Sequence, residues 1–269
     1  MVEHGKVDFQ GYSDRFDPKS YLESSCGTLD RRQGILKFIH DTFKRINENQ
    51  ELCRNMLDYG AGCSFHVVIG AAGVVSEICM AEYTEKNRAA LNDWLKGEPD
   101  AFDWSPFLKQ VVEDFEGNRK EDAIEDRKRR LKAITKAVVS CDLRSEKIIQ
   151  NGYEGPYDIV TCVGVVETCA RNEEEFDVFV HKLSFLVREG GKIILGCWKH
   201  PPGVDGYKVG NEFFNDLPVE EEFVVACLKK AGFSCIETTA VYPSELKYPV
   251  KVEKKGCIFY VGSKAVITH

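Results

Sequence analysis

Apolar residues recur along the chain in two patterns, one typical of helices and one typical of strands. Between Gly34 and Ile46, the apolar residues Ile35, Ile39 and Phe43 recur at helical spacing, which predicts an amphipathic helix. Farther on, short apolar runs bounded by glycine or polar residues predict buried strands, with periodic stretches between them that predict helices. The predicted strands cover 55–60, 76–83, 136–143, 157–166, 188–198, 233–242 and 256–266, and the helices after the first strand cover 62–73, 85–97, 173–187 and 220–232.

The order of these elements predicts an α/β fold with a mostly parallel sheet, because strands and helices alternate. Thr84 is a favourable N-cap for the helix that begins at Glu85, and Gly97 is a favourable end for it. The segment between the last two predicted strands is polar and contains proline, so it does not favour a crossover helix. We therefore expect these two strands to pair antiparallel at one end of the sheet. The charge-rich segment 116–133 predicts a solvated helix.

Composition narrows the class of protein without identifying it. The chain has 269 residues, a formal net charge of −7 and 43% hydrophobic residues, which suits a globular domain with a sizeable core. An acidic chain gives no electrostatic reason to expect nucleic acid or an anionic membrane as a partner. The first ten residues lack the apolar centre of a secretory signal, and no apolar stretch is long enough to span a membrane. We therefore expect a cytoplasmic protein without nucleic-acid or membrane partners.

The cysteines argue against a disulfide framework and against a metal site. The chain contains 11 of them, scattered singly, and no two have the CxxC spacing of a zinc ligand pair. Several lie inside apolar runs. We expect reduced and mostly buried thiols, and no bound metal.

The first candidate for chemistry is the stretch LDYGAGCS, residues 57–64, which follows the first predicted strand. Gly60 and Gly62 allow a tight turn and a close approach of the backbone to a ligand. The dinucleotide pattern requires a third glycine, but Phe65 stands there. Glu82, 20 positions after Gly62, ends the second strand, where a carboxylate can accept hydrogen bonds from ribose hydroxyls. This combination fits NAD and S-adenosylmethionine equally.

The end of the third strand carries a second candidate contact for an adenosine-bearing cofactor. Asp142 could accept the adenine amino proton, and the Leu143 backbone N–H could meet a ring nitrogen. The alternative for Asp142 is a cap of its own loop. His66 and His200 are lone histidines, which are more often structural, and no strong candidate for handling a hydride is present.

Three irregular segments resemble the family of small-molecule N-methyltransferases that includes the nicotinamide, phenylethanolamine and indolethylamine enzymes. They are YSDRFDPKSYLE (12–23), GEPDAFDWSP (97–106) and FEGNR (115–119), and the resemblance extends over 12–262. It implies a class I methyltransferase: a Rossmann-like, doubly wound, mostly parallel sheet with an antiparallel strand near the C-terminus and an N-terminal helical lid. It also implies a single domain over 1–269, with the lid and helices in 1–50, the core in 51–269, and substrate-cap insertions near 97–135 and 199–217.

The resemblance also implies a donor site for S-adenosylmethionine, with S-adenosylhomocysteine as the product. Tyr12 and Tyr21 resemble the tyrosines of the lid, Glu82 and Asn87 the ribose pair, and Asp142 an adenine contact. The full set of expected cofactor-binding residues is Tyr12, Tyr21, Asp58, Gly60, Ala61, Gly62, Ser64, Glu82, Tyr83, Asn87, Cys141, Asp142, Leu143 and Val163.

The residues of this chain match the family's acceptor site less well than its donor site. Glu167 matches an acidic residue that faces the substrate amine, and it is expected to be catalytic together with Tyr21. Cys197 stands where the nicotinamide enzyme has an aspartate, so nicotinamide is not supported as the acceptor. Other departures are Ser25, Cys26, Cys63, His66 and a longer loop after Trp198. The expected substrate-binding residues are Glu167, Cys197, Trp198, Tyr207 and Asp216, with loop packing as the alternative for the two aromatic residues.

The resulting hypothesis is an S-adenosylmethionine-dependent N-methyltransferase, a monomer that acts on a small amine or pyridine-like nitrogen. The donor is already activated, so in-line displacement asks the protein mainly to orient and desolvate the two reactants. Two alternatives stay open: a protein that binds the donor with little acceptor activity, and a methyltransferase that acts on a thioether.

Overall fold

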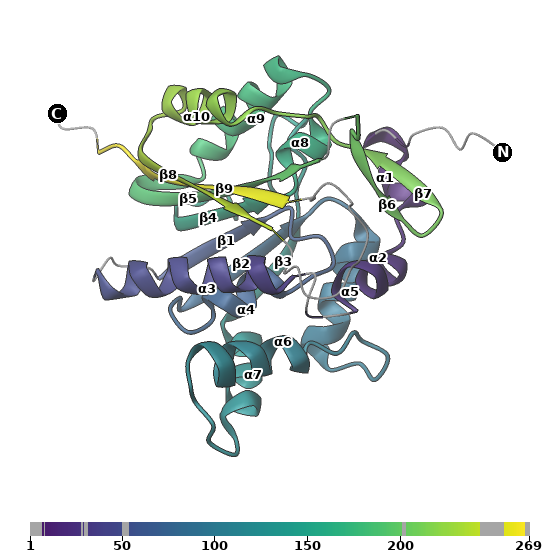
Figure 1. Ribbon diagram of the computed structural model, residues 1–269, viewed down its shortest axis with the longest axis vertical. Helices are drawn as coiled ribbons and strands as arrows, with labels where there is room; N and C mark the ends of the chain where they lie inside the picture. Colours follow the sequence, from purple (N-terminus) through teal and green to yellow (C-terminus); the bar gives the residue numbers. More distant parts are fainter. Residues whose placement is uncertain are drawn as a thin grey trace.

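A computed structural model describes residues 7, 9–27, 29, 32–49, 54–200, 203–242 and 256–266 of the chain. Within these ranges, seven strands form one sheet in the order β3-β2-β1-β4-β5-β9-β8 (Figure 1). Neighbours from β3 to β5 pair parallel, whereas β9 pairs antiparallel with both β5 and β8. The strands are β1 (Asn55–Tyr59), β2 (Glu77–Glu82), β3 (Thr135–Ser140), β4 (Tyr157–Val163), β5 (Val187–Lys199), β8 (Phe233–Val241) and β9 (Gly256–Lys264).

This topology confirms the predicted Rossmann-like, mostly parallel sheet with an antiparallel strand near its end. The two last strands pair antiparallel as expected, and β9 lies between β5 and β8. Alternate residues of the central strands face opposite sides, because the side-chain period of a strand is two. Met56 of β1 belongs to one buried apolar cluster, and the next residue, Leu57, belongs to the other. Both faces of the central strands are therefore covered, which explains why β1 and β4 are largely apolar.

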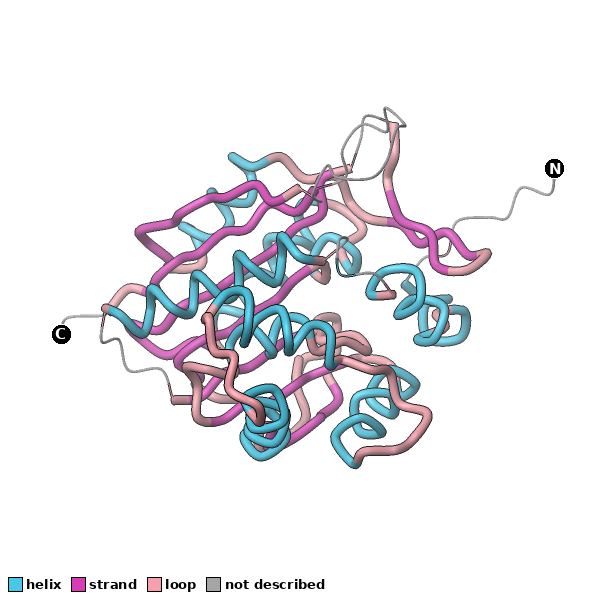
Figure 2. The backbone as a smooth tube through the Cα atoms, turned by 60° about the horizontal axis from the view of Figure 1, so that its bottom comes forward, coloured by secondary structure: helices cyan, strands magenta, loops and turns pink. Residues whose placement is uncertain are grey.

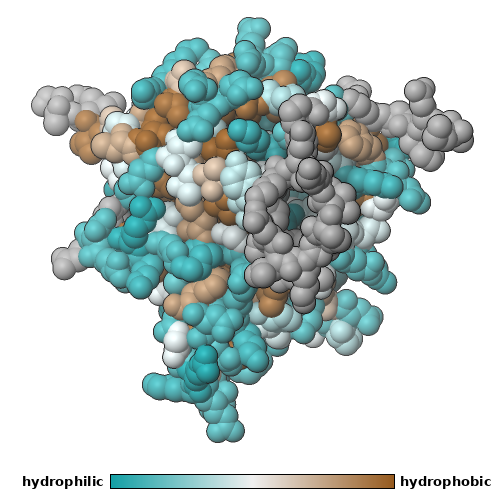
Figure 3. All heavy atoms as spheres, viewed as in Figure 1, coloured by the Kyte–Doolittle hydropathy of each residue, from teal (hydrophilic) through white to brown (hydrophobic). Residues whose placement is uncertain are grey.

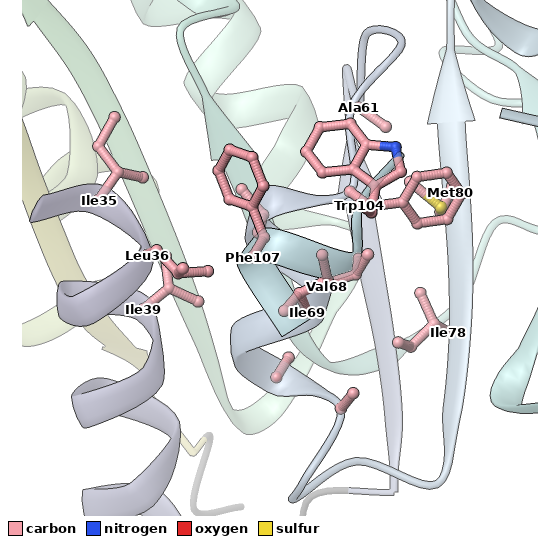
Figure 4. Packing of buried hydrophobic residues seen from close by; sticks show 14 of the residues in the cluster. Ile35, Leu36, Ile39, Ala61, Val68, Ile69, Ile78, Met80, Trp104 and Phe107 are labelled. Carbon is pink, nitrogen blue, oxygen red and sulfur yellow. The ribbon is translucent and has the colours of Figure 1, made fainter. Parts of the chain in front are cut away.

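Helices α3 (Gln33–Glu48), α4 (His66–Ala71) and α5 (Glu85–Lys96) cover one face of the sheet, and α9 (Glu173–Ser184) and α10 (Glu221–Lys230) cover the other. The predicted stripe of α3 is confirmed, since Ile35, Ile39, Phe43 and Ile46 are all buried. Figure 4 shows Ile35 and Ile39 among the side chains that α3 contributes to this core. The predicted caps of α5 are confirmed too: the Thr84 hydroxyl accepts the backbone N–H of residue 87, and Gly97 is left-handed with φ 84°.

The segment 97–135 forms a peripheral layer with α6 (Ser105–Lys109), a π-helical turn at Gln110–Phe115 and α7 (Ala123–Ile134). It occupies the lower part of Figure 1, and in Figure 3 hydrophilic residues predominate over the same region. Trp104 and Phe107 anchor the layer to the core and are 1% exposed. Arg130 of α7 donates to the carbonyls of residues 72 and 75 after α4. The solvated helix predicted from the charge-rich segment is thus present as α7.

The N-terminal helices α1 (Phe9–Arg15) and α2 (Pro18–Cys26) lie beside a hairpin of β6 (Gly206–Val209) and β7 (Glu212–Asn215) in both views (Figures 1 and 2). Val7 joins the hairpin edge: its N–H donates to the Phe213 carbonyl at 2.7 Å, and its carbonyl accepts from the Asn215 N–H at 3.2 Å. The longer loop predicted after Trp198 therefore contains a hairpin. Gly210, with φ 58°, is followed by an asparagine, and that pair is the signal for a two-residue hairpin turn that was overlooked.

A short helix α8 (Val166–Cys169) follows β4 and completes the list of elements near the sheet edge where the site lies. No helix of the described ranges is long and apolar enough to cross a membrane.

Candidate functional site

A cavity of about 860 Å³, open to solvent on one side, lies at the carboxyl ends of β1, β2 and β4, beneath α1, α2 and the hairpin. The volume of about 860 Å³ includes space that is open to solvent. Ligands of open α/β sheets bind at this edge of the sheet. The predicted residues that line it are Tyr12, Tyr21, Gly60, Ala61, Gly62, Ser64, Glu82, Tyr83, Cys141, Asp142, Leu143, Val163 and Tyr207; Phe16, Tyr59, His66, Gly164, Val165, Thr168 and Cys169 line it without having been predicted.

The glycine loop forms the floor of this cavity. Gly60 and Gly62 have φ of 73° and 61°, a region that favours glycine. A Cβ on Gly60 would lie 2.4 Å from a methyl group of Val165, so a side chain at that position has no room. The backbone N–H groups of residues 60 and 61 both donate to the Ala81 carbonyl, which holds the loop against the end of β2. The loop thus brings bare backbone to the cavity wall.

Glu82 links the glycine loop to the start of α5. Its Oε2 accepts from the Gly62 N–H at 3.0 Å, and its Oε1 accepts from the Thr84 N–H at 2.8 Å and from Asn87 Nδ2 at 3.0 Å. The residue is only 4% exposed but lines the cavity. Oε2 is left with lone-pair capacity for one more donor, such as a ribose hydroxyl. Asn87 is fully buried behind Glu82 rather than at the wall, and its Oδ1 has no hydrogen-bond partner among the described residues.

The end of β3 forms a third wall. The Asp142 carboxylate accepts the Arg144 N–H at 2.9 Å through Oδ1 and the Ser145 hydroxyl at 3.0 Å through Oδ2. The loop-capping alternative therefore describes what this carboxylate does within the chain. The residue also lines the cavity, together with its neighbours Cys141 and Leu143. Contact of Asp142 with an adenine amino group remains a prediction.

Ser64 and His66 bring two polar groups to the side of the cavity beneath the N-terminal helices. The Ser64 hydroxyl and His66 Nδ1 lie 2.7 Å apart, and His66 Nε2 is buried without a partner in the described part of the chain. Burial, with the nearby Arg32 charge, lowers the pKa of His66 to about 3, so the imidazole is neutral. A neutral ring that accepts from Ser64 at Nδ1 presents an N–H at Nε2, suited to an anionic or carbonyl oxygen. Sequence analysis had set this histidine aside as structural.

Asp58 lies below the loop and does not line the cavity. Its side chain is 3% exposed, and Oδ1 accepts the Thr161 hydroxyl at 2.7 Å. Burial raises the pKa of Asp58 to about 7, in spite of that hydrogen bond. The predicted contact of this residue with the cofactor therefore remains a prediction, and any influence from its present position is electrostatic.

Three tyrosines, Tyr12, Tyr21 and Tyr207, close the cavity from the side of α1, α2 and the hairpin. Burial raises the pKa of Tyr21 to about 12, so its hydroxyl keeps its proton at neutral pH and cannot act as a base. Arg32, at the start of α3, donates to the Tyr21 hydroxyl at 2.7 Å and stacks over the ring of Trp198 at 5.0 Å. This buried arginine, absent from the sequence-based set, ties the lid to the end of β5.

Four of the five predicted acceptor residues do not line the cavity. Glu167 is fully buried, and its Oε1 accepts the Trp198 N–H at 2.7 Å. Cys197 is 2% exposed, and burial, followed by the charge of Glu167, raises the pKa of its thiol well above the usual range. Trp198 packs against Gly164, where a Cβ would lie 2.4 Å from its Nε1. Of the predicted acceptor residues, Tyr207 alone lines the cavity.

Asp216 takes part in a contact that was not predicted. Its Oδ1 accepts the Thr168 hydroxyl at 2.8 Å, and its Oδ2 lies 2.6 Å from His200 Nε2. Thr168 lines the cavity, so its hydrogen bond connects Asp216 to the cavity wall. Neither Thr168 nor the pairing of His200 could be read from spacing, because residues 168, 200 and 216 belong to three separate segments.

Titratable groups in the described ranges do not form a metal site, since no cluster of three His, Cys, Asp or Glu side chains is present there. The described cysteines are free, and burial is the main cause that raises the pKa of the thiols at positions 141, 162 and 169. These thiols are therefore neutral packing groups and not nucleophiles.

Comparison with known sequences gives relatives over most of the chain. A sequence model of the NNMT/PNMT/TEMT family matches residues 4–265. Nicotinamide N-methyltransferase of Homo sapiens is 27% identical over 238 residues, covering 87% of this chain and 88% of the relative. Indolethylamine N-methyltransferase of Oryctolagus cuniculus is 26% identical over 98% of each chain. Phenylethanolamine N-methyltransferase of Homo sapiens is 26% identical over 93% of this chain and 89% of the relative.

Solved structures share the fold at low sequence identity. The SAM-bound amino pentose methyltransferase CalS10 from Micromonospora echinaspora has a TM-score of 0.52 and 14% identity, covering 98% of this chain and all of that one. Magnesium protoporphyrin IX methyltransferase from Synechocystis, with bound SAM, has a TM-score of 0.50 and 15% identity, covering 88% of this chain and 82% of that one. At this identity the likeness concerns the sheet and its helices alone.

Proposed function

The chain belongs to the NNMT/PNMT/TEMT family, and from this premise we propose that it transfers the methyl group of S-adenosylmethionine to the nitrogen of a small molecule. The observation that carries the proposal is the cavity itself. It joins a glycine loop, a buried carboxylate at the end of β2 and a roof of lid tyrosines in one space.

The residues of the cavity suit the donor. Glu82 can accept a ribose hydroxyl at Oε2, and Tyr83 and Leu143 offer apolar surface for the adenine. His66 Nε2, buried and unpartnered within the described ranges, suits the carboxylate of the methionine part. The missing third glycine is consistent with this donor, which has no pyrophosphate. When bound, the donor supplies a methyl group on a positively charged sulfur that is already activated for transfer.

The chemical work of the chain is positioning and exclusion of water. The lid tyrosines and Phe16 cover the cavity, and their apolar bodies lower the local dielectric constant. Holding the two reactants in line can supply about 7–11 kcal/mol of the barrier. An alkylamine must lose its proton before it can attack. Glu167, fully buried next to the cavity-lining Thr168, is our candidate to attract the ammonium and accept that proton, directly or through water.

One experiment tests the proposal against its alternatives. The protein is incubated with methyl-labelled S-adenosylmethionine and panels of amines, pyridines and thioethers, and S-adenosylhomocysteine binding is measured by calorimetry. Transfer to nitrogen supports the proposal, and transfer to sulfur alone would favour the thioether alternative. Tight binding without transfer to any acceptor would favour a binding protein. Absence of donor binding would overturn the assignment of the cavity.

Two further proposals concern the setting of the enzyme. We propose that it acts as a monomer on small molecules, and the position of the cavity beneath the three tyrosines supports a small acceptor. We also propose a cytoplasmic location, since the described cysteines are free, as expected in a reducing compartment.

A further inference from the structure

Three side chains from separate segments form a buried polar chain that ends at the cavity. Thr168 belongs to α8 and lines the cavity, Asp216 follows the hairpin, and His200 follows β5. The Thr168 hydroxyl donates to Asp216 Oδ1 at 2.8 Å, and Asp216 Oδ2 lies 2.6 Å from His200 Nε2. The side chains of His200 and Asp216 are 3% and 0% exposed. Buried polar groups at such distances hold one another in place.

The hydroxyl of Thr168 has only one proton to donate, and two acceptors compete for it. Besides Asp216, the carbonyl of Gly164 lies 3.0 Å away. Since both are acceptors only, the hydroxyl proton is engaged in either arrangement. What Thr168 has left is lone-pair capacity, so toward a ligand it acts as a hydrogen-bond acceptor.

Two buried acidic side chains lie behind Thr168. Asp216 and Glu167 are both buried, and the backbone N–H of Leu217 donates to the Glu167 carbonyl at 2.8 Å, so the backbone after Asp216 lies beside Glu167. His200 faces Asp216, and Arg32 lies over the ring of Trp198, whose backbone N–H donates to Glu167 Oε1. Tyr207 and Cys197 are titratable groups near these carboxylates, and Asp216 is among the causes that raise the pKa of both. Besides burial, the charge of Glu167 is among the causes that raise the pKa of Cys162, Cys169 and Tyr260. An ionised carboxylate at this wall attracts a cation in the cavity.

We propose that this chain of residues selects the acceptor: a primary or secondary amine that binds as an ammonium and donates an N–H to Thr168 Oγ1. Asp216 keeps the Thr168 hydroxyl engaged and supplies negative charge, and His200 positions Asp216. The inference rests on the proposed function, because it assumes that this wall of the cavity faces the methyl acceptor. Pyridines, thioethers and quaternary ammonium compounds carry no N–H on the reacting atom and gain nothing from Thr168.

The test measures binding, so it does not depend on turnover. Three ligands of similar shape are titrated by calorimetry into the protein saturated with S-adenosylhomocysteine: 2-phenylethylammonium, its N-trimethyl analogue and 2-phenylethanol. We expect Thr168→Val to weaken binding of the primary ammonium by about 10- to 100-fold, which is the range for the loss of a hydrogen bond to a charged group. The trimethyl analogue has the same charge without an N–H, and its affinity should change less than about twofold. Thr168→Ser should restore the preference.

A second variant separates charge from hydrogen bonding. Asp216→Asn should lower the affinities of both cations by a similar factor relative to the affinity of 2-phenylethanol. Thr168→Val should lower only the affinity of 2-phenylethylammonium, the cation that has an N–H. Thr135→Val is the matched control, because the Thr135 hydroxyl bonds the Leu131 carbonyl at 2.8 Å and residue 135 does not line the cavity. It should leave all three affinities unchanged.

The inference is overturned if Thr168→Val weakens the primary and trimethyl ligands equally, or neither of them. It is also overturned if the wild-type protein binds the phenylethanol as tightly as the ammonium. A protein that shows the expected preference but methylates nothing would contradict the proposed function and leave the inference standing. Methylation without the preference would do the reverse.

Discussion

At the scale of single residues, Glu82 carries more contacts than a ribose-binding carboxylate needs. It accepts hydrogen bonds from the glycine loop, from the N-cap Thr84 and from Asn87. The same side chain thereby shapes the floor of the cavity and leaves one acceptor position for a ligand. The Glu82 carboxylate therefore combines the binding role predicted from the sequence with a structural role in the glycine loop. A substitution of Glu82 tests both roles.

We expect Glu82→Ala to weaken binding of S-adenosylhomocysteine by about 10- to 100-fold, because the loss of a charge-assisted hydrogen bond costs about 1.5–3 kcal/mol. Isothermal calorimetry measures the change. Glu85→Ala, which alters an exposed acidic residue in the first turn of α5, should leave the affinity unchanged. Equal affinity in the Glu82 variant and the wild type would remove this residue from the donor site.

Asp58 gives a prediction about pH. Its pKa is raised by burial to about 7, so the folded protein keeps a proton there that the unfolded chain loses near pH 4. Between these values the folded state binds more protons than the unfolded state, and stability falls as pH rises, reaching a plateau above about 7. Asp58→Asn removes this dependence. From pH 5 to 7 the stability of the variant should rise relative to wild type by about 2–3 kcal/mol.

Urea unfolding at a series of pH values checks this expectation, with the exposed Asp100→Asn as the control. Parallel stability curves for wild type and Asp58→Asn would show that the Asp58 carboxyl is not held protonated.

At the scale of elements, the lid and the hairpin form one unit. Val7 pairs with β7, and Arg15 makes an ion pair with Glu212 at 2.6 Å. Between them, Phe214 is 1% exposed and packs edge-on against the rings of Tyr12 and Phe16. Two cavity-lining residues of the lid therefore depend on a hairpin about 200 positions later in the chain.

We expect Phe214→Ala to loosen the lid without unfolding the sheet. Removing a buried ring costs about 3–5 kcal/mol, and here the loss falls on the contacts between α1 and the hairpin. Hydrogen exchange in residues 9–26 should accelerate while α9 stays protected, and the KM for S-adenosylmethionine should rise. Phe185→Ala, at a site that is 66% exposed, should change neither quantity. Uniform loss of protection across the chain would show that the two elements are not a separable unit.

The elements that sequence analysis predicted are those with strong local patterns. The stripe of α3 and the caps of α5 depend on residues within one or two turns, and both are confirmed. The hairpin has strands of only four residues, and its partners are distant: Val7 on one side and the rings of the lid on the other. Such short strands have little pattern of their own, so only the Gly210 turn could have revealed them.

The candidate site divides in the same way. The glycine loop and Glu82 lie within one β-α-β segment, and spacing alone brings them to the cavity. The chain from Thr168 to Asp216 spans 48 positions and needs the fold to form. Polar residues such as His66 and His200 had no signal beyond their type. Their value became visible through burial and unsatisfied nitrogen atoms.

At the scale of the whole molecule, the distribution of cysteines is a property of the fold. Eight of the described cysteines are buried, Cys169 is half-buried, and Cys235 is exposed. Cys235 lies in β8 with φ 50°, where the register of β8 with β9 shifts.

Native thiol titration with a chromogenic disulfide should therefore show a fast phase that includes Cys235, with the buried thiols reacting only on unfolding. Cys235→Ser should reduce the fast phase by one equivalent and leave methyl transfer intact. A fast phase unaffected by this substitution would mean that the exposed edge at β8 is closed in solution.

The position of β9 has a consequence for synthesis on the ribosome. This strand, at Gly256–Lys264, lies between β5 and β8, so the sheet cannot be completed until residue 264 has been translated. Until then β5 has an open edge, and such edges are where nascent chains associate wrongly. Val7 likewise cannot form its backbone hydrogen bonds until residues 213–215 have been translated. During translation, the pairing of Val7 and the completion of the sheet thus both depend on segments that are made about 200 residues or more after Val7.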